Sequence, residues 1–292
     1  PSETMEDLFL FVMEDLDEKK IIGISGLVSH VGIDQPFYTL RMEHERHRSE
    51  SLGIESNLRL LKPVSIRNGP SEMCTLYLLP DYRKGKLGRL LSLSRFLFIA
   101  AFPDRFDSEV IAEMRGVVSS DGYSPFFEEV GRHFFNMDFQ TIEILSSENK
   151  FFIKELMPRY PIYIDILSSE AQAVIKQPHP NTVAALKLLE REGFQVSEDV
   201  DLLDAGPKVS AQKTKIRAIK ESIIAPIIEI TKENIESEDF LISNENINYR
   251  AGISKLLIKD QGLVFPYESA QSLFLEVGDK LRYVRPYPEQ RK

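Results

Sequence analysis

The sequence contains a single cysteine, Cys74, which excludes a disulfide framework and a cysteine-based zinc site. No apolar run approaches the length of a membrane span, and the first residues, PSETMEDLFLF, lack the basic and then apolar segments of a secretion signal. Basic residues are also few, because 36 Lys and Arg stand against 45 Asp and Glu and give a net charge of −9. This balance argues against general nucleic-acid binding. We therefore expect a cytoplasmic protein in a reducing setting, with neither membrane nor nucleic acid as a partner.

The chain has 292 residues, which is enough for more than one domain, each with its own apolar core. It begins with Pro1, so we expect either processing or a true start further upstream. From about residue 205 the pattern changes to short strand-like runs broken by polar turns. We predict a core over 1–145, an extension of helices and strand over 146–204, and a small β domain over 205–292.

Apolar patterns predict an α+β fold. Alternation over 7–13, 20–30 and 36–43 indicates an antiparallel meander, whereas 45–69 has no period and predicts a surface connection. The run from Met73 to Leu79 predicts a strand buried on both faces, and the residues from Leu87 to Ala101 predict a helix. Helices are also expected from Ser124 and over 151–155, 168–175 and 181–192, and strands over 108–116, 134–144, 200–203, 216–219, 227–230, 240–243, 252–258 and 273–284.

The turn between the strand and the helix, PDYRKGKLG over 80–88, is a candidate anion site. Free amides and the positive end of the dipole at a helix start favour a phosphate, and Arg83, Lys84 and Lys86 add positive charge. A Walker loop is disfavoured because Gly88 is followed by Arg89 and Leu90, and the three spaced glycines of a Rossmann turn are absent. On these residues alone, a basic turn without a ligand is an equally good interpretation.

The same turn resembles the pyrophosphate loop of the GCN5-related acyl-CoA N-acyltransferases. Arg83 and Gly88 stand at the first and last positions of that motif, Lys86 replaces its middle glycine, and Gly85 comes one residue early. The segment 126–131, FFEEVG, resembles a helix end of that superfamily, but Phe127 replaces its usual tyrosine and cannot donate a proton. The resemblance implies a mixed sheet flanked by helices and contacts to coenzyme A from Arg83, Lys84, Gly85, Lys86 and Gly88.

Longer motifs over residues 70–205 resemble the arginine N-succinyltransferase family. They are EMCTL at 72–76, LLSLSRF at 90–96, AEMRG at 112–116, GYSPF at 122–126, FFNMDF at 134–139, ELMP at 155–158, EAQ at 170–172 and HPNT at 179–182. The resemblance implies an acyl-CoA N-acyltransferase fold followed by a small β-barrel-like domain. It also implies transfer of succinyl from succinyl-CoA to the α-amine of L-arginine in arginine catabolism, with no permanently bound cofactor or metal, and assembly as a homo- or hetero-oligomer. The family's first strand and helices, which shape the acceptor side, have no counterpart after Pro1.

The resemblance assigns residues to two roles. Leu76 and Leu78 would contact succinyl-CoA, Leu76 through its backbone and shape, because a pantetheine arm can pair with a strand edge. A plain core leucine fits position 76 as well. His179 would be the proton donor, since an imidazole can give or take a proton near neutral pH. Its setting between Pro178 and Pro180 by itself favours a surface histidine in a stiffened linker.

Two further residues are candidates on the substrate side. Glu113 could receive the proton of the amine or bind the guanidinium of arginine, and Arg115 or Arg95 could bind the succinyl carboxylate. A structural ion pair between Glu113 and Arg115, two residues apart in a strand, is the alternative. Other open alternatives are ornithine or another basic amino acid as acceptor, an acetyl donor, and a non-catalytic subunit that binds coenzyme A beside an active paralogue.

Overall fold

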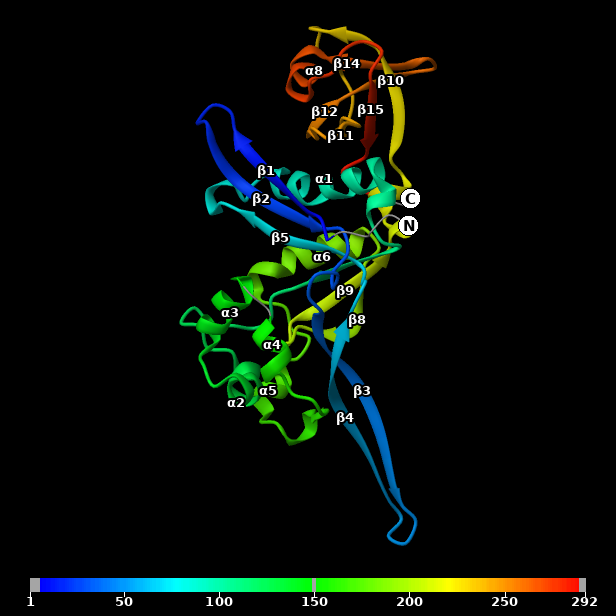
Figure 1. Ribbon diagram of the computed structural model, residues 1–292. Helices are drawn as coiled ribbons and strands as arrows, with labels where there is room; N and C mark the ends of the chain where they lie inside the picture. The colour runs from blue at the N-terminus through cyan, green and yellow to red at the C-terminus, as the bar shows by residue number, and fades with distance from the viewer. Residues whose placement is uncertain (1–5, 149–150, 289–292) are drawn as a thin grey trace.

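The computed structural model describes residues 6–148 and 151–288. Two sheets organise this part of the chain (Figure 1). One has nine strands in the order β1-β2-β5-β6-β9-β8-β3-β4-β7, and the other has six in the order β12-β11-β15-β10-β14-β13. In the described ranges, no helix has the length and apolar character that crossing a membrane requires. The α+β class predicted from the sequence is confirmed.

The large sheet begins with an antiparallel meander of β1, β2 and β5. Its strands are β1 (Leu8–Asp15), β2 (Lys20–Val28) and β5 (Ser71–Leu78). Between β2 and β5 the chain forms a long hairpin of β3 (Phe37–Ser49) and β4 (Ile54–Ile66), which projects from the body of the molecule (Figure 1). The surface connection predicted over 45–69 is therefore wrong. Most residues of the projecting part are exposed on both faces, so their side chains show no apolar alternation.

The largest apolar cluster lies between two helices and the centre of the large sheet. Helix α1 (Leu87–Ala101) has the predicted bounds, and α6 (Val183–Arg191) follows a short turn, η5 (Pro180–Thr182). Both helices pack in one apolar cluster with β6 (Glu109–Glu113) and β9 (Pro207–Gln212). The remaining strand of this region is β8 (Gln195–Val200), which pairs with β9.

A group of short helices covers the other end of the sheet. The helical turn that starts after Ser124 continues as a π-helix, η3 (Phe127–Gly131), and Ser124 Oγ accepts the amide of Phe127 at 3.3 Å. The strand predicted over 134–144 is wrong, because Asp138 caps a helix there and Phe139 and Ile142 bury one face of it. The elements are α2 (Arg132–Phe135), α3 (Phe139–Glu148), α4 (Phe151–Leu156), β7 (Ile162–Tyr163), η4 (Ile164–Ile166) and α5 (Ser169–Val174).

The six-stranded sheet forms the C-terminal unit. Its elements are β10 (Ile223–Thr231), β11 (Asp239–Ser243), β12 (Ala251–Lys255), β13 (Leu257–Lys259), β14 (Gly262–Pro266), α8 (Tyr267–Leu273) and β15 (Lys280–Val284). In the described residues the strand pairings run from β12 at one edge of this sheet to β13 at the other. The strand predicted from residue 273 begins only at Lys280, because α8 and a turn precede it.

The predicted boundary at residue 205 falls just before a strand of the large sheet. Strand β9 is hydrogen bonded between β6 and β8 and so belongs to the large sheet. The strand predicted over 216–219 is instead a helix, α7 (Arg217–Lys220), because the buried Glu192 carboxylate accepts the Ala218 amide at 2.9 Å and fixes the turn. We propose that the division falls between α7 and β10.

Candidate active site

The site begins where β5 and β6 separate. These two parallel strands pair only at Ser71 with Val110 and at Glu72 with Ile111. Beyond Glu72, the edge of β5 that faces β6 has no strand partner in the described part of the chain. Leu76 and Tyr77 are exposed there by 40% and 49%. The prediction of a strand buried on both faces is therefore wrong for its second half, and Leu76 is not a plain core leucine.

A β-bulge shapes the same segment. Ser25 of β2 pairs with Leu76, but its neighbour Gly26 pairs with Cys74, so Thr75 is the extra residue. Thr75 has φ of 42°, which is a costly conformation for a β-branched residue. The bulge turns the peptide groups of β5 out of the regular ladder at the point where its edge is free.

Arg95 of α1 stabilises this bulge from inside the protein. It is 2% exposed, and its Nη1 donates to the carbonyls of Gly26 at 3.2 Å and Cys74 at 3.1 Å. Burial lowers the pKa of its guanidinium to about 10. The suggestion that Arg95 binds the succinyl carboxylate is therefore wrong, because its donors are used by the protein and it does not reach the surface.

The predicted anion loop lies at the end of β5. A short turn, η1 (Pro80–Tyr82), precedes α1, and Gly85 has φ of 63°, a conformation that favours glycine. Leu90 is the first residue of α1 whose amide donates to a carbonyl one helical turn earlier, and its acceptor is the carbonyl of Lys86. The amides of Leu87, Gly88 and Arg89 therefore belong to the free group at the helix start, and no acidic residue lies in this first turn.

The basic side chains of the loop differ in their contacts. Arg83 Nε donates to the Leu78 carbonyl at 2.8 Å, and its guanidinium lies 5.6 Å from the centre of the Tyr77 ring. Lys84 is exposed and, within residues 6–148 and 151–288, has no side-chain partner. Lys86 differs from the expectation, because its Nζ lies 2.5 Å from Asp239 of β11 and this contact raises its pKa. Its charge is thus already used to join the loop to the C-terminal unit.

His179 stands just beyond the end of β6. Its main-chain amide donates to the Arg115 carbonyl at 2.7 Å, and Thr182 Oγ1 donates to the carbonyl of His179 at 2.9 Å. The ring is half-buried, and its Nδ1 accepts the amide of Asn181 at 3.1 Å. In this tautomer Nε2 carries the ring proton and is the nitrogen that can donate to a substrate.

The acidic and basic candidates at the end of β6 have different surroundings. Arg115 forms a two-point ion pair with Glu143 of α3, with Nη1 to Oε1 at 3.0 Å and Nη2 to Oε2 at 3.1 Å. The Arg115 charge is therefore compensated by Glu143. Glu113 instead lies directly opposite Lys208 of β9 in the sheet register.

The candidates form two groups. Leu76, Leu78 and Arg83 belong to β5 and its loop, whereas Arg115 and His179 belong to the end of β6. No hydrogen bond or ion pair of the described residues joins the groups, which are related through the pairing of β5 with β6. Sequence reasoning missed Thr75, Glu143 and the buried Asp204, which accepts the Gly116 amide at 2.8 Å. The Asp-x-Gly sequence at 204–206 signals a turn but not its contact with β6.

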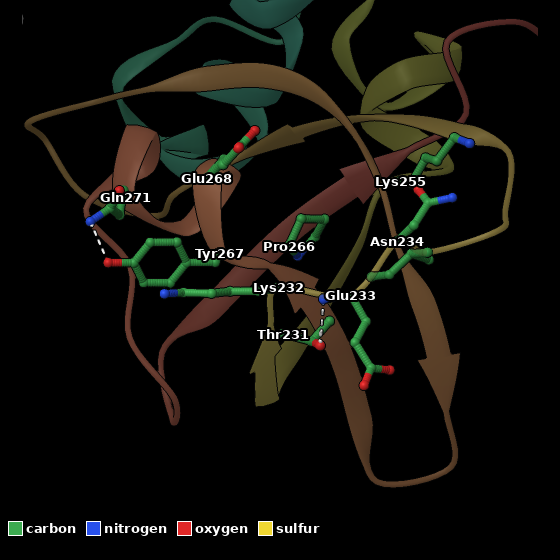
Figure 2. A pocket seen from close by; sticks show the side chains of 10 residues that line it. Thr231, Lys232, Glu233, Asn234, Lys255, Pro266, Tyr267, Glu268 and Gln271 are labelled. Carbon is green, nitrogen blue, oxygen red and sulfur yellow. Dashed lines mark hydrogen bonds between the residues drawn. The ribbon is translucent and has the colours of Figure 1, made fainter.

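Two other features lie outside this site. Among residues 6–148 and 151–288, no His, Cys, Asp and Glu side chains gather in threes that could hold a metal ion. A pocket of about 720 Å³ lies in the C-terminal unit, where Lys232 Nζ is 4.8 Å from the centre of the Tyr267 ring and Gln271 Nε2 donates to the Tyr267 hydroxyl at 2.7 Å (Figure 2). It contains none of the predicted site residues.

Known proteins match both the sequence and the fold. A family model described as arginine N-succinyltransferase beta subunit matches residues 1–218. The chain belongs to the arginine N-succinyltransferase family. Arginine N-succinyltransferase of Yersinia pseudotuberculosis serotype O:3 is 40% identical over 296 residues, which cover 98% of this chain and 84% of the relative. The protein of that name from Escherichia coli strain 55989 is 38% identical over 288 residues, with the same coverage.

A solved structure extends the match to three dimensions. Arginine/ornithine succinyltransferase subunit AI from Pseudomonas aeruginosa superposes with a TM-score of 0.88 at 30% identity, covering 97% of this chain and 83% of that one. The family predicted from the motifs is thus confirmed. The mixed sheets and the helices that hold the candidate residues belong to the fold of an arginine N-succinyltransferase.

Proposed function

We propose that this chain transfers a succinyl group from succinyl-CoA to the α-amine of L-arginine. The observation that carries the proposal is the separation of β5 from β6 after Glu72, which leaves a strand edge with the bulge at Thr75 at its centre. This separation also supports an acyl-CoA N-acyltransferase type of fold for the large sheet. Family membership and the position of His179 agree with the proposal.

Succinyl-CoA would bind along β5 and its loop. The pantetheine arm can add to the free edge as an extra strand, with Leu76 and Leu78 shaping its path. The pyrophosphate would lie on the free amides at the start of α1, near Gly85 and Gly88, with Arg83 and Lys84 as the nearby cations. Lys86 would contribute less, because Asp239 already neutralises it.

The reaction needs one proton to move from nitrogen to sulfur. The neutral α-amine attacks the thioester carbonyl carbon, and backbone amides on the free part of β5 stabilise the resulting oxyanion. The C–S bond then breaks, and Nε2–H of His179 donates a hydrogen bond to the departing sulfur and stabilises its negative charge. The proton that the nitrogen loses on forming the amide passes to the sulfur, so that coenzyme A leaves as the thiol.

The acceptor would approach from the end of β6. Glu113 is the last residue of β6 and Arg115 follows it closely, so we assign both to the acceptor side of the site. Arg115 could bind the succinyl carboxylate only by releasing Glu143, and Glu113 is the carboxylate at this end of β6 that could bind the guanidinium of arginine.

A thiol-release assay tests the proposed function. Coenzyme A should appear when succinyl-CoA and L-arginine are supplied together, and mass spectrometry should find the succinyl group on the α-nitrogen. Acetyl-CoA should be a poor donor because it lacks the carboxylate. Absence of turnover with every pair of succinyl-CoA and a basic amino acid would reject the proposal.

A second acceptor, ornithine, is suggested by the Pseudomonas aeruginosa protein, whose name includes both amino acids. The words "beta subunit" and "subunit AI" in the names of the matches also raise assembly with another chain. Comparing kcat/KM for arginine and ornithine separates the acceptors. Mass measurement in solution, with this chain alone and with a paralogous subunit, separates a homo-oligomer from a hetero-oligomer, and an inactive chain that still binds coenzyme A would indicate a non-catalytic subunit.

A further inference from the structure

The loop that carries His179 is fastened to the protein at two main-chain points. The His179 amide donates to the Arg115 carbonyl at 2.7 Å, and the Lys176 amide donates to the Ala205 carbonyl at 2.9 Å. Between these two anchors lie only Gln177 and Pro178. The direction of the two accepting carbonyls therefore decides where the histidine backbone lies.

Both of these carbonyls belong to peptide groups that Asp204 holds from the other side. The N–H of the Arg115–Gly116 peptide group donates to Asp204 Oδ2 at 2.8 Å. The N–H of the Ala205–Gly206 peptide group donates to Asp204 Oδ1, also at 2.8 Å. One carboxyl group thus orients two peptide planes, and each plane presents its carbonyl to the His179 loop.

Close packing around Asp204 brings both peptide groups within hydrogen-bond distance of its carboxyl group. The residue is 6% exposed, and a Cβ added at Gly116 would come within 2.5 Å of the Asp204 carbonyl. A Cβ at Gly206 would collide with the Met114 carbonyl. The two glycines let the two segments approach closely enough for one side chain to bridge them.

We propose that Asp204 is a positioning residue for His179. Hydrogen bonds in such a chain polarise one another. Because Asp204 accepts both N–H groups, the carbonyls of the same two peptide groups become stronger acceptors for the amides of the His179 loop. An asparagine at position 204 keeps the shape but offers an NH₂ group in place of one acceptor oxygen. One of the two peptide groups is then free to rotate, and Nε2 of His179 moves relative to the thioester.

The inference rests on the role proposed for His179, and a double-mutant cycle separates the two. Asp204→Asn should lower kcat about tenfold, as expected for a small displacement of a reacting group, and leave KM for succinyl-CoA within about twofold. In a His179→Ala background the same substitution should cost no further kcat, because it acts only through the histidine. A persistent loss in that background, or an unchanged kcat for Asp204→Asn alone, overturns the positioning role. Full activity of His179→Ala instead rejects the proposed chemistry.

A matched control distinguishes positioning from general loss of a buried carboxyl group. Glu192 is fully buried and binds Arg217 and the Ala218 amide away from the histidine loop. Glu192→Gln should lower the thermal midpoint but not kcat of the folded enzyme. If Asp204→Asn does not fold, hydrogen exchange on the wild-type chain decides, since the amides of Lys176 and His179 should be protected. Exchange at the rate of an exposed loop would overturn the proposal.

Discussion

His179 and Arg115 are joined through their main chains, by an amide-to-carbonyl hydrogen bond of 2.7 Å. The guanidinium of Arg115 forms an ion pair with Glu143 of α3 instead. The candidate proton donor is thus placed by the end of β6 and not by the side chain of its neighbour in space. Substitutions of the Arg115 side chain should consequently leave the position of the histidine unchanged.

Replacing His179 with alanine should lower kcat about 100-fold or more, the usual contribution of a positioned acid or base. Binding of coenzyme A should change little, because no hydrogen bond or ion pair in the described structure joins His179 to β5 or its loop. Steady-state kinetics and calorimetric titration with coenzyme A measure the two effects. His133→Ala, at an exposed position of α2, is the control and should retain activity. Equal loss in both variants would contradict the assignment.

Replacing Lys84 with alanine should raise KM for succinyl-CoA about threefold, and the effect should shrink as salt is added, because this exposed cation acts through screened attraction. Lys86→Ala should raise KM less, since Asp239 already neutralises Lys86. The measurement is KM at low and at high ionic strength for both variants. A larger effect from Lys86 than from Lys84 would show that the ion pair with Asp239 opens on binding.

Local pattern was enough to predict the elements that carry the coenzyme side of the site. The apolar run of α1 and the turn before it follow from residues close in the sequence, and their bounds agree with the structure. The exposed hairpin of β3 and β4 could not be found this way. Its strands pair with each other but cover no core along most of their length, so burial leaves no period in the sequence.

The contacts that place the histidine and the anion loop depend on distant parts of the chain. Asp204 lies 88 residues from Gly116, and Lys86 lies 153 residues from Asp239. No periodicity or spacing relates such residues, because the sheet order that brings β6 beside β9 is a property of the whole fold. The sequence motif HPNT indicated the histidine, but its partners could be seen only in three dimensions.

Replacing Arg95 with lysine should lower the free energy of unfolding by about 2 kcal/mol, because an ammonium cannot reach both the Gly26 and the Cys74 carbonyls and leaves one buried acceptor without its donor. The bulge at Thr75 should loosen, so KM for succinyl-CoA should rise as well. Denaturant unfolding and kinetics measure the two effects. Arg105→Lys, in an exposed pair with Asp7, should change neither quantity. An unchanged KM in Arg95→Lys would mean that the bulge does not depend on this contact.

Replacing Asp199 with asparagine should lower the free energy of unfolding by about 3 kcal/mol, because the buried Lys208 would lose its ion pair with the carboxylate of residue 199. Burial raises the pKa of Asp199, but the hydrogen bonds and charges of Arg41 and Lys208 outweigh it and hold the pKa below the ordinary 3.8. The native state therefore binds this proton more weakly than the unfolded chain. The stabilisation is complete above pH 3.8 and is lost as the pH falls through the lower native value.

The test of this pH dependence is denaturant unfolding of the wild type and Asp199→Asn between about pH 2.5 and 7, since the ion pair is absent below the native pKa. The difference in stability between the two proteins should be constant near neutrality and narrow in acid. Glu55→Gln, which removes the exposed partner of Arg46 on the hairpin, is the control and should follow the wild-type curve. A difference that stays constant down to the lowest pH would show that the carboxylate charge of Asp199 contributes nothing, and that the loss in the variant comes from packing alone.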